Sequence, residues 1–132
     1  MIRASALLVS RLTDELVGEL GPVRPESVSV RFFPRWIGRL GPGWVAAMAM
    51  PWAIYLRPEL LAADDLVIAR TIAHELVHMR QWKTLGPVRF LYQYVSAYVR
   101  NRLNGADHRQ AYATIPLEKE AYAVADRCFP HI

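Results

Sequence analysis

The sequence predicts an α+β fold in which several helices pack on a small antiparallel sheet of two to three strands. Apolar residues recur at helical spacing in four segments, and alternation typical of strands lies between the first and second of these segments. A His-Glu-x-x-His motif lies in the second helical segment. With 132 residues, of which 53% are hydrophobic, the chain can form one core, so we expect a single domain over residues 1–132.

The first part of the chain predicts a helix and then a strand. Leucine and valine side chains at helical spacing over residues 4–20 give an amphipathic helix, which Gly21-Pro22 ends. Val28–Phe32 alternates apolar and polar residues and predicts a strand that ends near Pro34. Residues 35–43 contain three glycines and a proline, which predict a loop.

Val45–Leu56 predicts a second strand region, which Pro51 divides. Pro51 marks either a turn between two short strands or a place in an edge strand, because proline cannot donate a hydrogen bond within a central strand. An edge strand beside the motif could accept an extended peptide by strand addition. In both cases the strand pair comes directly before the helix that carries the motif.

The next helix carries His74-Glu75-Leu76-Val77-His78. Residues four apart share one helix face, so His74 and His78 could bind one Zn²⁺. The Glu75 carboxylate would lie beside the open metal position, where it could accept a proton from an activated water. Gln81 is three residues beyond His78, and it could line the cleft or support a ligand from the second shell.

A catalytic zinc with two histidine ligands needs a third protein ligand. Pro116 favours a last helix over residues 116–126, and Glu118 and Glu120 lie in its first turn, where the helix dipole also favours carboxylates. These two side chains point about 200° apart around the helix, so at most one of them binds the metal. Glu118 is favoured because it borders a face of small residues. Other candidates remain open: Glu120, His108 and Asp126.

Between these two helices, Val88–Leu103 predicts a further helix. Aromatic residues at positions 90, 94 and 98 form a stripe of the kind that usually packs in a core. From position 80 to 109 the chain has six basic residues and one acidic residue, Asp107. A basic, aromatic helix could also rest on a membrane surface or a partner protein, but we favour a solvated basic face. We see no module that reads nucleic acid specifically.

The composition limits the kinds of metal site and the cellular location that we expect. The single cysteine, Cys128, excludes an intramolecular disulfide and a cysteine-based zinc site, and it indicates a reducing compartment. The apolar run over residues 44–56 is too short to span a membrane, and the N-terminus lacks the shape of a secretory signal. We therefore expect a soluble, cytoplasmic protein.

The motif, together with Glu118-Lys119-Glu120-Ala121, resembles the zincin metallopeptidases of the gluzincin type. In those enzymes His-Glu-x-x-His is followed on a later helix by Glu-x-x-Ala. The resemblance implies a zincin-like fold with the metal site between the motif helix and a C-terminal helix. It also implies that His74, His78 and Glu118 bind Zn²⁺ and that Glu75 is the general base.

The likeness extends over residues 45–126. His74–Trp82 and Ile115–Ala121 are more closely similar to small, uncharacterised bacterial zincin-like domains. Tyr122 stands where many gluzincins have an aspartate that supports a ligand histidine, so we expect Tyr122 in the second shell or the cleft. Candidates for stabilising an oxyanion are Tyr122, Tyr112, Tyr94, Arg80 and His108.

Three functional hypotheses follow. We favour a zinc-dependent metallopeptidase that hydrolyses a peptide or protein substrate through an activated water. The second hypothesis is a catalytically silent, zinc-stabilised zincin-like domain for binding or regulation, which could need a partner or a homo-oligomer. The third is a surface-associating protein whose basic aromatic helix acts without any metal.

Overall fold

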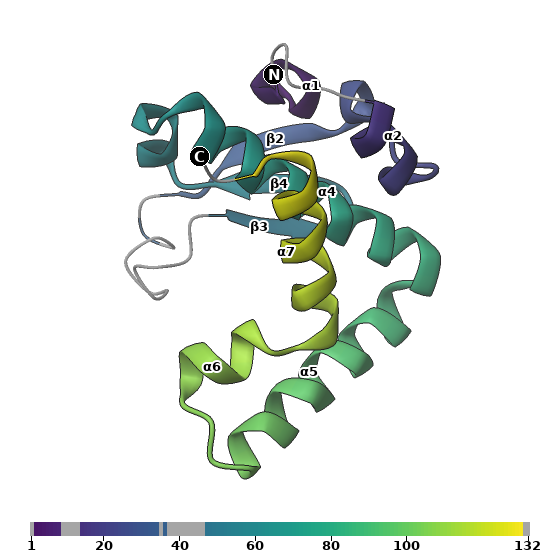
Figure 1. The fold of residues 1–132 in the computed structure, drawn as a ribbon, viewed down its shortest axis with the longest axis vertical. Coiled ribbons are helices and arrows are strands. Elements are labelled where there is room, and N and C mark those ends of the chain that lie inside the picture. Colours follow the sequence, from purple (N-terminus) through teal and green to yellow (C-terminus); the bar gives the residue numbers. More distant parts are fainter. Residues whose placement is uncertain (1, 9–13, 35, 37–46, 131–132) are drawn as a thin grey trace.

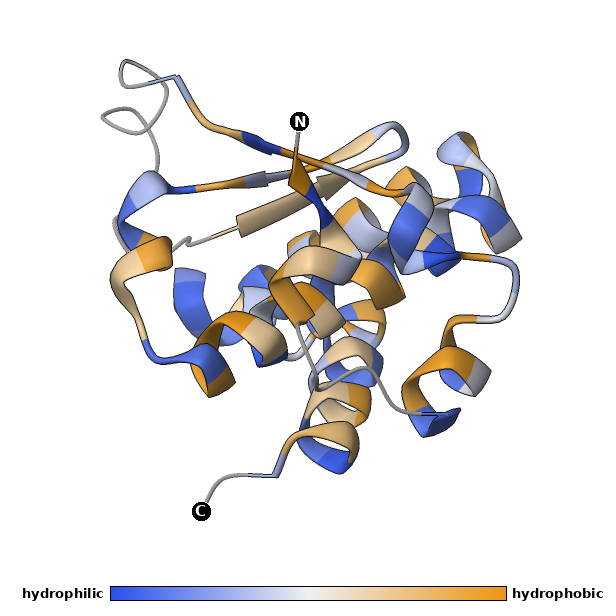
Figure 2. Ribbon diagram, turned by 90° about the horizontal axis from the view of Figure 1, so that it is seen from above, coloured by the Kyte–Doolittle hydropathy of each residue, from blue (hydrophilic) through white to orange (hydrophobic). Residues whose placement is uncertain are grey.

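The computed structural model describes residues 2–8, 14–34, 36 and 47–130. These residues form an α+β fold, as expected, with the strands along one side of the molecule and most of the helices on the other (Figures 1 and 2). The elements in chain order are β1 (Ile2–Arg3), α1 (Ala4–Leu8), α2 (Asp14–Leu20), η2 (Pro25–Ser27), β2 (Ser29–Phe32), β3 (Ala47–Met50), β4 (Ala53–Leu56), η3 (Pro58–Ala62), α4 (Asp65–Leu85), α5 (Pro87–Leu103), α6 (His108–Ala113) and α7 (Pro116–Cys128).

The sheet is mixed, so the expectation of an antiparallel sheet is wrong. Its four strands have the order β1-β2-β4-β3, and the central pair, β2 and β4, is parallel. The composition of β4 explains its central place, because Ala53, Ile54 and Leu56 are all buried and parallel strands are typically covered on both faces. The pattern within a strand does not reveal which neighbour it pairs with. The strand β1 was not predicted because two residues carry no periodic signal.

Pro51 lies in a turn between two short strands, which confirms one of the two alternatives for this region. Met50 pairs with Ala53, so Pro51 and Trp52 form the connection of a hairpin. The first strand of this hairpin, β3, is an edge strand of the sheet in the described part of the chain.

Within the helix expected over residues 4–20, the structure describes two helical segments, α1 and α2, and residues 9–13 lie outside the described residues. Asp14 and Glu15 occupy the first turn of α2, where carboxylates are stabilised by the helix dipole, and they mark a new helix start that apolar spacing alone does not show. The loop expected over residues 35–43 lies outside the described residues, except for position 36.

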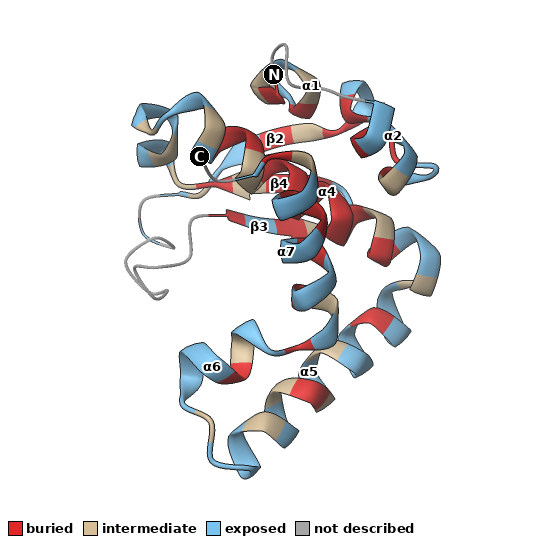
Figure 3. Cartoon of the chain, viewed as in Figure 1, coloured by how far each residue is buried: buried red, intermediate tan, exposed pale blue. Residues whose placement is uncertain are grey.

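The centre of the molecule is α4, which has 21 residues and lies among α1, α2, α5, α7 and the sheet (Figure 1). Its middle is buried on all sides, as Figure 3 shows for this part of the helix. The closest partner of α4 is α7, whose buried Ala121 and Ala125 are small enough for the two helices to approach closely. None of the described helices is long and apolar enough to cross a membrane.

The connection from α4 to α5 generates a prediction about stability. Gly86 has φ 81° and ψ 160°, a backbone conformation that only glycine adopts readily. We expect Gly86→Ala to lower the free energy of unfolding by about 1–3 kcal/mol through backbone strain, although the added Cβ has no atom within 4 Å. Urea unfolding followed by circular dichroism measures this change.

Gly18 in α2 is the matched control, because its added Cβ would also meet nothing within 4 Å and its φ is not positive. Gly18→Ala should raise the free energy of unfolding by about 0.5–1 kcal/mol, since alanine favours a helix. Equal effects of the two substitutions would contradict this account of the α4–α5 connection.

Candidate metal centre

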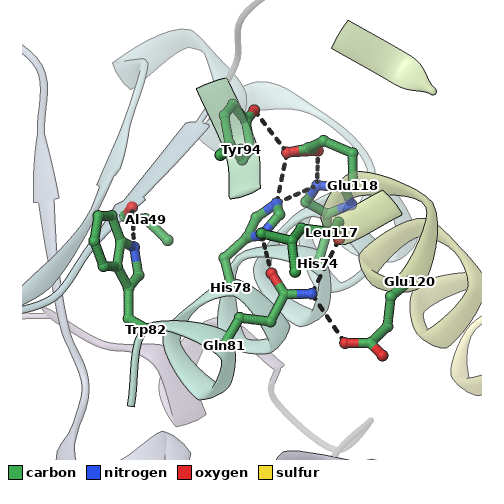
Figure 4. Close-up of polar contacts among 9 residues, drawn as sticks. All are labelled: Ala49, His74, His78, Gln81, Trp82, Tyr94, Leu117, Glu118 and Glu120. Atoms are coloured by element: carbon green, nitrogen blue, oxygen red, sulfur yellow. Dashed lines mark hydrogen bonds and ion pairs between the residues drawn. The ribbon is translucent and has the colours of Figure 1, made fainter. Parts of the chain in front are cut away.

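Two histidines on α4 face the helix α7. His74 and His78 are one helical turn apart and buried, with 7% and 5% of their surface exposed. Their Nε2 atoms are 3.2 Å apart, so both rings present the same nitrogen to one point in space (Figure 4). The spacing of the two histidines in the motif therefore brings their Nε2 atoms together, as the sequence predicts.

Glu118, in the first turn of α7, brings a carboxylate to the same point. Its side chain is almost fully buried, and its Oε1 lies 2.8 Å from His74 Nε2 while its Oε2 lies 2.7 Å from His78 Nε2. The ligand atoms of these three residues all lie within 4.8 Å of one another. The structure thus contains a buried His-His-Glu group that could hold a metal ion.

The geometry of this group fits a tetrahedral metal. With Zn–N bonds of about 2.0–2.1 Å, two ligand nitrogens of a tetrahedral zinc lie about 3.3 Å apart, close to the 3.2 Å between the two Nε2 atoms. Two imidazoles and a carboxylate suit Zn²⁺, although other divalent transition ions accept the same donors. The residues present therefore fit a metal of this class.

Gln81 fixes the orientation of the His78 ring. Its Oε1 accepts a hydrogen bond from His78 Nδ1 at 2.7 Å, and its Nε2 donates to the carbonyl of Leu117 at 3.0 Å and to Glu120 at 2.9 Å. Because both N–H groups of the Gln81 amide donate hydrogen bonds to α7, the amide oxygen must face His78. The Nδ1 atom of His78 then carries the proton, which leaves the Nε2 lone pair for a metal.

The two acceptors around His78 also control its protonation. Burial of the ring lowers its pKa, but the hydrogen bond to Glu118 and the nearby charge of Glu75 outweigh this effect and raise the pKa of His78 to about 9. The pKa of Glu118 is lowered well below its usual range, because the hydrogen bonds from His74 and His78 outweigh the desolvation of its carboxylate. Without a metal, the group is therefore held together by a buried ion pair.

Tyr94 on α5 supports Glu118 from the other side. Its hydroxyl donates a hydrogen bond of 3.0 Å to Glu118 Oε2. Burial, followed by the charge of Glu118, raises the pKa of Tyr94, so the hydroxyl keeps its proton and remains a donor. The aromatic stripe of α5 predicts that this ring faces inward, but nothing in the sequence predicts that its hydroxyl reaches Glu118.

Glu75 lies between the two histidines and the edge strand β3. It is buried, and desolvation raises its pKa, while the nearby histidines and a backbone hydrogen bond from Ala49 oppose that rise. Trp82, two turns further along α4, donates from Nε1 to the carbonyl of Ala49 at 3.0 Å. These two contacts fasten the outer edge of β3 to α4 at Ala49.

The other candidate ligands have different partners. Glu120 contacts Arg80 and Gln81, His108 contacts Tyr98, and Asp126 contacts Arg70. The ring of Tyr122 packs edge-on against His74 with centroids 4.3 Å apart, so it touches a candidate ligand through its ring. Among the residues that the structure describes, only His74, His78 and Glu118 form a possible ligand group.

Comparison with models of known families, with curated proteins and with solved structures yields no match to this chain. The resemblance to the zincins therefore depends on sequence motifs, namely His74–His78 and Glu118–Ala121, and it stays a prediction.

The raised pKa of His78 predicts how metal binding depends on pH. A metal at Nε2 must displace the proton that Glu118 stabilises there, so the apparent affinity for Zn²⁺ should rise about tenfold per pH unit from neutral pH and level off near pH 9. Competition with a chromophoric chelator, corrected for protonation of the chelator, measures this slope. The same slope is expected for His108→Ala, whereas a flat profile in the wild type would contradict the assignment.

The same pKa sets a second pH dependence, in the metal-free protein. Because the pKa of His78 rises from 6.5 to about 9 on folding, its contribution to stability is complete below pH 6.5 and is lost as the pH rises through about 9. Urea unfolding of metal-free protein across this range should show the loss. The loss should be much smaller in Glu118→Gln, because Glu118 supplies both a hydrogen bond and a charge to His78, and a loss of unchanged size in that variant would contradict the ion pair.

The role of Gln81 can be tested with one substitution that removes the hydrogen-bond acceptor and one that keeps it. Gln81→Leu removes the acceptor for His78 Nδ1 and should weaken Zn²⁺ binding about 10–100-fold. Gln81→Glu keeps an acceptor at that position and should retain more of the affinity. Gln93→Leu, at an exposed position of α5, is the control and should bind as the wild type does. Equal affinities for Gln81→Leu and Gln93→Leu would contradict the positioning role.

Proposed function

We propose that this protein is a zinc-dependent metallopeptidase. The observation that supports this proposal most strongly is the convergence of His74, His78 and Glu118 in one buried group, with the buried carboxylate of Glu75 next to it. A His₂Glu ligand set with an adjacent carboxylate is one of the arrangements used by catalytic zinc sites.

In this proposal the metal is held by the Nε2 atoms of His74 and His78 and by the carboxylate of Glu118. When bound, Zn²⁺ supplies Lewis acidity, which lowers the pKa of a water and polarises a substrate carbonyl. Gln81 holds the His78 ring in the required tautomer, and Tyr94 holds the Glu118 carboxylate in place. Both supports come from residues outside the ligand group.

Glu75 performs the proton transfers in this proposal. Its carboxylate accepts a proton from the attacking water, whose oxygen bonds to the carbonyl carbon of the substrate. As the carbon–nitrogen bond breaks, the same proton passes to the leaving amine. Burial raises the pKa of Glu75, which favours a carboxylate that can both accept and release a proton, and a bound cation would oppose this rise.

The substrate would be an extended peptide alongside β3, the edge strand next to Glu75. The amide and carbonyl of Ala49 are already engaged by Glu75 and Trp82. Strand addition at this edge is therefore limited to backbone groups on the N-terminal side of Ala49, which is a narrower contact than the sequence alone suggests.

A zinc-stabilised domain without turnover is the second candidate. The observation that favours it is the closed state of the group, in which His74, His78, Gln81 and Glu118 satisfy one another. In the described residues no buried side-chain nitrogen or oxygen lacks a hydrogen-bond partner. A structural metal site needs no access for a substrate.

Glu75→Gln separates the two candidates. For a peptidase, this variant should bind zinc as the wild type does and lose hydrolysis of a casein or peptide-library substrate by about 10²–10⁴-fold, because the base is removed but the ligands remain. Glu59→Gln, at an exposed position in η3, is the control and should keep full activity. Zinc-loaded wild type that hydrolyses nothing, or Glu75→Gln that remains active, would contradict the peptidase proposal.

A further inference from the structure

The outer face of α5 carries an apolar stripe that the rest of the described chain does not cover. Six large apolar side chains on this helix are between 46% and 82% exposed. On a helical projection they fall within an arc of about 120° that runs along the whole helix. We call this set the α5 stripe: Val88, Leu91, Tyr92, Val95, Val99 and Leu103.

The opposite face of α5 attaches the helix to the protein. Phe90 and Ala97 are buried, and the Phe90 ring stacks on Trp82 of α4 with centroids 3.8 Å apart. Tyr94 on the same face reaches Glu118. The helix is therefore anchored without any contribution from the α5 stripe, and it forms the lower right border of the molecule in Figure 1.

The charges beside the α5 stripe have one sign. Arg89 and Arg100 lie along one side of it, and Arg102 lies within its arc near the C-terminal end, all of them exposed. No aspartate or glutamate occurs from position 76 to 106. Within the described residues, no carboxylate forms an ion pair with any of these three arginines.

We propose that the α5 stripe binds the surface of an anionic lipid bilayer, with the helix axis in the plane of the membrane. A 17-residue helix presents a line of contact about 25 Å long. Its apolar side chains would enter the boundary between headgroups and acyl chains, while the flanking arginines would lie at the level of the lipid phosphates. In this arrangement the exposed apolar side chains are removed from water, and the unpaired arginines lie close to negative charges.

A second copy of the chain is a poorer occupant of the same face. Packing two such helices against each other would bring Arg89, Arg100 and Arg102 of one copy close to those of the other, with no acidic residue on either helix to neutralise them. A lipid surface supplies many negative charges without a fixed geometry. The proposed contact does not involve the metal ligands, so it stands independently of the peptidase proposal.

The test is co-sedimentation of the full chain with vesicles of phosphatidylglycerol and phosphatidylcholine in equal parts. We expect binding that weakens with added salt and that is much weaker for vesicles of phosphatidylcholine alone. Val95→Ser with Val99→Ser should weaken binding at least about tenfold. Arg89→Gln with Arg100→Gln should weaken it roughly 30-fold.

The chain offers matched controls for both pairs. Val17→Ser with Val67→Ser removes two valines of similar exposure, 46% and 45%, from α2 and α4. Arg24→Gln with Arg31→Gln removes two exposed arginines elsewhere. Both control pairs should bind vesicles as the wild type does, and unchanged circular dichroism should show that each variant folds.

The following results would overturn the proposal. The first is no binding to the anionic vesicles. The second is vesicle binding that the α5 stripe variants do not reduce, or equal binding to soluble polyglutamate, which would indicate only a basic patch for an acidic polymer. The third is a wild-type dimer in sedimentation that Val95→Ser with Val99→Ser converts to a monomer, because the α5 stripe would then bind a second copy.

Discussion

The burial of the Glu118 carboxylate against two histidines is the interaction on which the rest of the structure depends. A carboxylate with 1% of its surface exposed would be strongly destabilising without partners, and His74 and His78 supply them from the neighbouring helix. This requirement fixes the position of α7 along α4. The link from Gln81 to the Leu117 carbonyl strengthens the same register with a bond to the backbone of α7.

The positions of the helices that carry the ligand group were predictable from sequence, because local periodicity determines them. The spacing of His74 and His78 puts both on one face, and helical phase separates Glu118 from Glu120, as the different partners of the two glutamates show. The direction and order of the strands were not predictable, because they depend on long-range pairing. The hydrogen bond from the Tyr94 hydroxyl could not be predicted from the sequence either, because it depends on the angle between α5 and α7.

The helices α4 and α5 connect the His-His-Glu group to different parts of the protein. Through Glu75 and Trp82, α4 holds the edge strand β3 at Ala49, so the carboxylate and the strand are fixed by one rigid element. Through Tyr94, the inner face of α5 supports Glu118, while its outer face remains apolar and positively charged. The inner aromatic stripe (Phe90, Tyr94 and Tyr98) and the α5 stripe thus lie on different sides of one helix, and the first supports Glu118 while the second remains exposed. The sequence periodicity predicts only the first of them.

The most direct test of the central claim is the zinc content per chain of the wild type, Glu118→Ala and Glu120→Ala, measured by elemental analysis after incubation with zinc and removal of the excess. Stoichiometric zinc is expected in the wild type and in Glu120→Ala, since in the described part of the chain Glu120 contacts Arg80 and Gln81 rather than the ligand group. The zinc should be lost in Glu118→Ala. Wild type that retains no zinc, or Glu118→Ala that retains as much as the wild type, would contradict the assignment of the metal group.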